Sequence, residues 1–405
     1  MTPLHLAIAL DGAGWHPAAW REPTARPAEL FTAGYWVDLV RSAEAGLLDF
    51  VTVEDSFDLP PLSLDPQHVQ GRLDAVLTAC RVAPLTERIG LVPTQVATHT
   101  EPFHAAKAIA TLDFVSRGRA GTRIQVSHRA TEFANVGRRT PPDVRDADQL
   151  GVLFDEAADH VEVSRRLWDS WEDDAEIRDA ATGRFIDRSK VHYIDFAGDF
   201  FSVKGPSIVP RPPQGQPVVT ALAHVEHAYR LAARSADIVF VTPRDADDAA
   251  HIVGLVREAE AEAGREQGEV RVFADLVVFL DRPGESGAAR RARLDAADGT
   301  EGTEYASDAA ILTGSAALVA DVLASWQHAG ISGYRLRPAA LPDDLDAITA
   351  DLVPELQSRG LFRREYAETT LRERLGLDRP PSRYASAAAA TAATGSTAVT
   401  TGGVA

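Results

Sequence analysis

The stretch LHLAIAL, residues 4–10, and the polar turn DGAGWHPAAW that follows it, residues 11–20, show the pattern that decides the fold. A short apolar run with strand character ends, and residues able to do chemistry come directly after it. The same pattern recurs seven times along the chain. The predicted strands are residues 4–10, 49–53, 88–93, 121–126, 217–222, 237–241, 270–279 and 333–337.

Segments of helical period separate these runs. Ile109, Leu112 and Val115 form one apolar stripe, and residues 153–171 carry an apolar face wide enough to pack on a sheet. Parallel strands need such crossover helices, and the crossovers are right-handed. The sequence therefore predicts an α/β fold, an eight-stranded parallel β/α (TIM) barrel. A doubly wound open sheet is the alternative.

The chain of 405 residues exceeds the roughly 250 that such a barrel needs. Long insertions around strands 4 and 5, residues 127–151 and 172–216, absorb part of the surplus, and loops of that length are usually functional. We predict one barrel domain, residues 1–379, and a disordered low-complexity tail, residues 380–405, which has little to bury.

Composition limits the partners. A net charge of −18 and a pI near 5.1 argue against binding to nucleic acid. No apolar run reaches the roughly 20 residues of a membrane span. The first apolar run is already a strand with no basic segment before it, so no signal peptide is expected. These features predict a cytoplasmic enzyme, and we expect a homo-oligomer, a dimer or tetramer.

Several common cofactor motifs are absent from the sequence. Gly12 and Gly14 suggest a dinucleotide loop, but Pro17 stands where a third glycine would open a helix. There is no phosphate loop of the GxxxxGK[ST] type, no HExxH and no paired CxxC. His224 and His227 are spaced to hold a metal, but without a third ligand we interpret them as exposed histidines at a helix start and predict no metal site.

Polar residues collect where the predicted strands end. In a parallel barrel these ends meet at one mouth, which carries the active site. A capping or turn role is the alternative for each residue taken singly. The strand-end residues are Asp11, His16, Glu54, Asp55, residues 94–99, Ser127, His128, Arg129, Ala223 and His224.

Several segments together carry a resemblance to a known family. They are GWHPAAWR near the N-terminus, LDFVTVEDS, EPFHAAKAIATLDFVSRGRAG, RRLWDSWEDDA and GPSIVPRPPQGQPVV. The chain resembles the bacterial luciferase-like flavin-dependent monooxygenases, in the branch of nitrilotriacetate and dibenzothiophene sulfone monooxygenases. The resemblance covers about residue 4 to beyond residue 241. It implies a barrel that holds reduced FMN, delivered by a separate flavin reductase, with O2 as oxidant and a small organic molecule as substrate.

The resemblance also implies which residues contact the flavin. Asp55 matches an acidic residue beside the isoalloxazine ring, and Thr98 matches a threonine after strand 3. In strand 4, which ends at Ser127, Arg123 replaces an asparagine of the family and places a fixed cation near the flavin. The family's QAGSS phosphate loop becomes TALAH here, so Ala223, His224 and the following helix start are the expected phosphate contacts.

His16, His99 and His128 are the candidates for proton handling, because histidine titrates near neutral pH. His16 is favoured, since it lies in the best-matched motif. Two other functions stay open: hydride transfer with the deazaflavin F420, as in other branches of the superfamily, and a non-catalytic flavin-binding barrel. The sequence does not identify the substrate.

Overall fold

Eight parallel strands form a closed barrel in the computed structural model, which describes residues 3–59, 66–143, 145–298 and 304–385. Strand pairing runs β1-β2-β3-β4-β9-β10-β11-β13 and returns from β13 to β1. All eight predicted strands are confirmed, and the open sheet is excluded. The barrel strands are β1 (His5–Leu10), β2 (Phe50–Val53), β3 (Gly90–Val96), β4 (Gly121–Gln125), β9 (Val218–Leu222), β10 (Ile238–Val241), β11 (Arg271–Leu280) and β13 (Gly333–Pro338).

One further strand of the barrel sheet, β12 (Ala310–Gly314), was not predicted. β11 is ten residues long, whereas its neighbour β10 has four. β10 pairs with β11 only as far as Ala274, and β12 pairs with the remainder from Leu276 to Leu280. β12 thus supplies hydrogen-bond partners to backbone groups of β11 that β10 does not reach.

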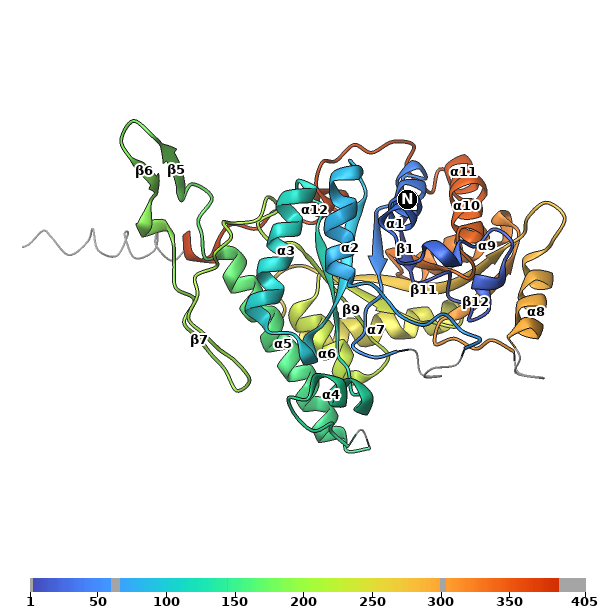
Figure 1. The fold of residues 1–405 in the computed structure, drawn as a ribbon, viewed down its shortest axis with the longest axis horizontal. Helices are drawn as coiled ribbons and strands as arrows, with labels where there is room; N and C mark the ends of the chain where they lie inside the picture. Colours follow the sequence, from blue (N-terminus) through green and yellow to red (C-terminus); the bar gives the residue numbers. More distant parts are fainter. Residues whose placement is uncertain (1–2, 60–65, 144, 299–303, 386–405) are drawn as a thin grey trace, which may run out of the picture.

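Helices surround the barrel (Figure 1). Side chains cap the starts of seven of the described α-helices, through Thr32, Asp74, Asp146, Asp245, Ser286, Ser315 and Thr370. None of the helices in the described ranges combines the length and apolar character that a membrane crossing demands. The helices are α1 (Ala33–Ala45), α2 (Ala75–Val82), α3 (Pro102–Ser116), α4 (Ala130–Val136), α5 (Ala147–Asp169), α6 (Glu226–Ser235), α7 (Ala246–Glu262), α8 (Gly287–Ala297), α9 (Ala316–His328), α10 (Asp343–Ala347), α11 (Val353–Ser358) and α12 (Leu371–Arg374).

The barrel interior has an apolar layer and a charged layer. Phe50, Phe240 and Phe273 are fully buried near the N-terminal ends of the strands, where Leu371 and Leu375 pack against them. Because side chains alternate along a strand, the residue two places further on faces the same interior. On β11 that residue is Asp275, which begins the charged layer nearer the C-terminal ends.

The predicted insertions form α4 (Ala130–Val136), the first turn of α5 (Ala147–Asp169) and two hairpins. The hairpins are β5 (Glu176–Asp179) with β6 (Arg184–Ile186), and β7 (Phe196–Ala197) with β8 (Ser202–Val203). Both hairpins project away from the barrel (Figure 1). The insertions therefore have structure of their own.

The first residues of the predicted tail pack against α5. Ser382 is buried, and its hydroxyl donates to the carbonyl of Asp169 at 3.0 Å. Arg383 pairs with Glu162 at 2.8 Å. Residues 386–405, the rest of the predicted tail, lie outside the described residues.

Candidate active site

The loop after β1 is held against the loop after β13. The amides of Trp15 and His16 donate to the carbonyls of Pro338 and Ala339 at 3.0 and 2.9 Å. Gly14, with φ of +131°, makes this approach possible, because a Cβ atom there would lie 2.4 Å from the carbonyl oxygen of Ala339. The glycine that suggested a dinucleotide loop thus serves a close contact between two backbones.

A cavity of about 450 Å³ opens beside this loop, at the C-terminal ends of β1, β2 and β4. Its size is that of a small-molecule site. Trp15, Trp20, Phe31 and Trp36 give it aromatic walls, and its polar lining includes Asp11, His16, Glu54, Asp55, Arg72, Gln125 and Arg129. This is the mouth at which β/α barrels carry their active sites.

Beside the cavity, Glu54 lies between two arginines of the barrel interior. Arg123 on β4 pairs with Glu54, and Arg335 on β13 does so at 3.2 Å. Burial opposes ionisation of Glu54, but Arg123 and Arg335 outweigh it and lower the pKa of that carboxyl. Glu54 is therefore a fixed negative charge at the cavity.

Asp275 joins the two arginines of β13. Its carboxylate accepts from Arg335 Nε at 2.8 Å and from Arg337 Nε at 3.0 Å. All three side chains are about 1% exposed or less. Arg337 also pairs with Asp308 at 2.6 Å, and its guanidinium lies 4.4 Å from the centre of the Trp15 ring. The network thus supports one aromatic wall of the cavity.

Two other carboxyls at the cavity, those of Asp55 and Asp11, have raised pKa values. Burial raises the pKa of Asp55, and the hydrogen bonds from the amides of Ala75 and Ser56 oppose this only in part. Burial also raises the pKa of Asp11, against the attraction of Arg72, which donates to it at 2.8 Å. Neighbouring carboxyls with pKa values moved in opposite directions are a common arrangement for proton transfer.

His16 lines the cavity with both ring nitrogens engaged. Its Nε2 lies 3.0 Å from Asp295 Oδ1, and its Nδ1 accepts from the amide of Ala18 at 3.1 Å. An accepting Nδ1 places the single proton of a neutral ring on Nε2, which donates it to Asp295. Burial lowers the pKa of His16, which also favours the neutral ring. Proton transfer by His16 would require the contact with Asp295 to break.

The other predicted histidines lie elsewhere. His99 and Thr98 line a separate cavity of about 320 Å³ after β3, where His99 Nε2 is 3.7 Å from Glu132 Oε2. The Thr98 hydroxyl accepts from the amide of Ser127 at 2.9 Å, which ties the ends of β3 and β4 together. His128 is exposed and lines neither cavity.

The predicted phosphate contacts after β9 already have partners. His224 Nδ1 lies 2.9 Å from Thr242 Oγ1, and its Nε2 lies 3.3 Å from Asp308 Oδ2. Ala223 is buried, and its amide donates to the carbonyl of Phe240 at 2.9 Å. Glu226, in the first turn of α6, adds negative charge at this helix start. The end of β9 thus presents no uncommitted donor side chain among the residues named for it.

The structure therefore brings together Asp55 and His16 of the predicted set in one cavity lining, and Arg123 contacts Glu54 and Gln125 of the same lining. Sequence reasoning missed the roles of Arg335, Arg337 and Asp275. Arg335 and Arg337 are two residues apart on one strand, so they share a face. That spacing, with the single Asp in the apolar run of β11, was the available signal.

The raised pKa of Asp55 leads to a prediction on stability. The folded state holds the proton to higher pH than the unfolded chain, so ionisation of Asp55 destabilises the fold once pH passes its unfolded pKa of about 4. Asp55→Asn should therefore gain melting temperature relative to wild type at pH 8, and the gain should shrink toward pH 4. Thermal melts across this range test it. A difference that does not change with pH would contradict the raised pKa.

Comparison with known proteins relates the chain to a family of monooxygenases. Residues 14–317 match the luciferase-like monooxygenase family. The chain is 29% identical to N-acetyl-S-(2-succino)cysteine monooxygenase of Bacillus subtilis (strain 168) and 29% identical to nitrilotriacetate monooxygenase component A of Aminobacter aminovorans. Each alignment covers 94% of this chain and 98% of the relative. The structure of EDTA monooxygenase from Chelativorans sp. BNC1 superposes with a TM-score of 0.79 at 25% identity, over 94% of this chain and 99% of that one. The predicted family is confirmed: this chain belongs to the luciferase-like monooxygenases.

Proposed function

We propose that this protein is the oxygenase component of a two-component monooxygenase, which takes reduced FMN from a separate flavin reductase and uses O2 to oxidise a small organic substrate. The observation that carries the proposal is the 450 Å³ cavity, with aromatic walls and polar residues at the C-terminal ends of β1, β2 and β4. The names of the relatives support the reaction class.

The residues of the cavity fit a flavin ring. Gln125 Oε1 accepts from Arg123 at 2.9 Å, so its amide NH2 is left to donate to a ring heteroatom. Asp55 supplies a carboxyl that can accept a hydrogen bond from the ring when it is ionised, or donate one when it is protonated. Arg129 lies on the lining with its guanidinium 4.0 Å from its nearest carboxylate, Glu132. We assign the phosphate of the cofactor to Arg129, since His224 is held by Asp308 and Thr242.

When bound, reduced FMN supplies the electrons that activate O2, one atom of which enters the substrate while the other leaves as water. Trp15, Trp20 and Trp36 exclude water from this chemistry. Asp55, with its raised pKa, is placed to hold and return a proton. Glu54 stays ionised beside Arg123 and Arg335 and keeps the field in the cavity fixed.

A binding titration and an oxygen assay test the proposal. Reduced FMN, added without oxygen, should quench the fluorescence of the tryptophans that line the cavity. NADH with FMN alone should give no reaction. When an unrelated flavin reductase is added, the protein should bind the reduced FMN that it produces before free oxygen oxidises it. Tight binding of F420 with no binding of reduced FMN would replace the monooxygenase reading with hydride transfer.

Asp55→Ala should weaken binding of reduced FMN by more than tenfold, about 1.4 kcal/mol, because the variant removes a polar contact inside the cavity. Thr98→Val is the matched comparison, since Thr98 lies in the neighbouring cavity but is a contact implied by the resemblance. Unchanged affinity in both variants would remove both residues from the site. A loss in Asp55→Ala alone would place the ring in the 450 Å³ cavity.

A further inference from the structure

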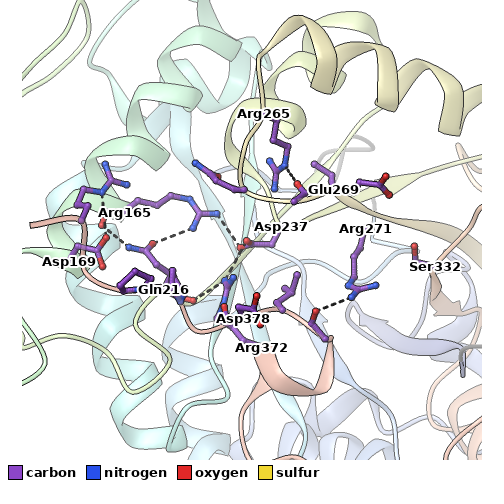
Figure 2. A pocket seen from close by; sticks show the side chains of 18 of the residues that line it. Arg165, Asp169, Gln216, Asp237, Arg265, Glu269, Arg271, Ser332, Arg372 and Asp378 are labelled. Carbon is purple, nitrogen blue, oxygen red and sulfur yellow. Dashed lines mark hydrogen bonds and ion pairs between the residues drawn. The ribbon is translucent and has the colours of Figure 1, made fainter. Parts of the chain in front are cut away.

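A second, larger cavity lies at the other end of the barrel. It measures about 850 Å³, and its lining includes Gln216, Asp237, Arg271 and Ser332, which stand at the starts of β9, β10, β11 and β13. Figure 2 shows Arg271 and Ser332 on one side of this cavity, Arg165 and Gln216 on the other, and Arg372 between them. The barrel strands separate the two ends, and β1, with six residues at about 3.3 Å each, spans about 20 Å. This cavity is therefore distinct from the candidate active site.

Arginine is concentrated in this cavity although the whole chain carries a net charge of −18. Six arginines line it against five acidic residues. Most of these acids are already paired: Asp237 with Arg165 at 3.1 Å and with Arg372 at 3.4 Å, and Glu269 with Arg257 at 3.4 Å. Burial opposes ionisation of Asp237, but Arg165 and Arg372 hold its pKa at about 2. Among the described residues, five of the six arginines thus pair with a carboxylate, and Arg271 is the one that does not.

Arg271 has no carboxylate partner among the described residues. Within the described part of the chain its guanidinium makes one hydrogen bond, from Nη2 to the carbonyl of Gly376 at 3.1 Å, and its buried Nε meets no acceptor. The buried Nε of Arg165 likewise meets no acceptor among the described residues. Buried polar groups are almost always hydrogen-bonded, and an unmade bond to a charged donor is costly. Burial alone lowers the pKa of Arg271, as expected for a cation with no nearby anion. The site therefore lacks an acceptor.

We propose that this cavity binds the phosphate group of a phosphorylated small molecule, with Arg271 as its principal contact. A phosphate offers several acceptor oxygens to guanidinium donors that approach from different sides, which suits Arg271, Arg165 and Arg372 better than a single planar carboxylate does. The volume exceeds that of inorganic phosphate and suits the monoester of a larger molecule. The proposal is independent of the flavin site.

Inorganic phosphate and ribose 5-phosphate are the probes, added to the full chain without flavin, with sodium chloride at equal ionic strength as the reference. Saturable binding by calorimetry is expected for both, with ribose 5-phosphate the tighter. Arg271→Met should weaken both by at least tenfold, because it removes the cation for which the described residues supply no carboxylate. Acetate should bind at least tenfold more weakly than phosphate.

Arg383→Met is the matched control, since Arg383 lines the same cavity but is paired with Glu162 and Asp169. Its phosphate affinity should stay within threefold of wild type. Heat responses that chloride reproduces, or equal binding by wild type and Arg271→Met, would overturn the proposal. Because Arg271 is far from the flavin cavity, Arg271→Met should titrate with reduced FMN as wild type does, which also shows that the variant is folded.

Discussion

Asp275→Ala is expected to lower the free energy of unfolding by about 3–5 kcal/mol, the cost of breaking a buried ion pair from one side. Asp275 is the shared partner of Arg335 and Arg337, and all three are buried inside the barrel. Removal of the carboxylate leaves Arg335 with Glu54 and Arg337 with Asp308, and both guanidiniums lose their closest counter-charge. Chemical denaturation measures the loss.

Asp143→Ala is the control for this prediction. Asp143 also pairs with an arginine, Arg145, at 2.7 Å, but both side chains are largely exposed. Its melting temperature should match wild type, because solvent screens exposed pairs. A loss in Asp275→Ala no larger than that of the control would show that the interior arginines are satisfied without Asp275.

Gly14→Ala is expected to destabilise the protein by about 3 kcal/mol and to weaken binding of reduced FMN by more than tenfold. The new Cβ would lie 2.4 Å from the Ala339 carbonyl oxygen, and the residue would keep a φ of +131° that only glycine adopts readily. The loop that carries Trp15 and His16 must then move away from the loop after β13, and the cavity loses part of its wall. Melting temperature and a flavin titration report the two effects.

Gly34→Ala provides the matched comparison, since a Cβ there meets no atom within 4 Å. It lies in α1, where alanine favours the helix over glycine, so its stability should equal or exceed that of wild type. If Gly14→Ala melts and binds like Gly34→Ala, the close approach of the two loops is not needed for the cavity.

Strand positions were predictable because a strand that is buried on both faces appears in the sequence as a run of apolar residues. Parallel barrel strands are mostly apolar, and turn residues bound them, so each of the eight runs was identified within a few residues. β12 was missed because its role depends on another strand. β11 extends past β10, and only the folded structure shows that the backbone groups of this extension need hydrogen-bond partners, which β12 supplies.

The sequence predicted the location of the candidate site, but only some of the residues that line it. Strand ends of a parallel barrel meet at one mouth, so Asp55 and His16 were expected there and do line one cavity. His99, Thr98 and His128 follow strands as well, but the direction of each side chain depends on the loop that carries it. The loop after β3 turns Thr98 and His99 toward α4 and α5, into the smaller cavity.

The sequence alone determined the barrel, its family and the mouth at which to seek the chemistry, because periodicity and motif spacing are local properties of the chain. Only the tertiary structure decided the electrostatics. Glu54 and Asp55 are adjacent in sequence, yet their pKa values move in opposite directions, because Arg123 and Arg335 reach Glu54 from strands far along the chain. Likewise, no carboxylate of the described residues pairs with Arg271, because of what surrounds it in the folded protein. Charge interactions depend on distance in space and on burial, and neither quantity is written in the order of residues.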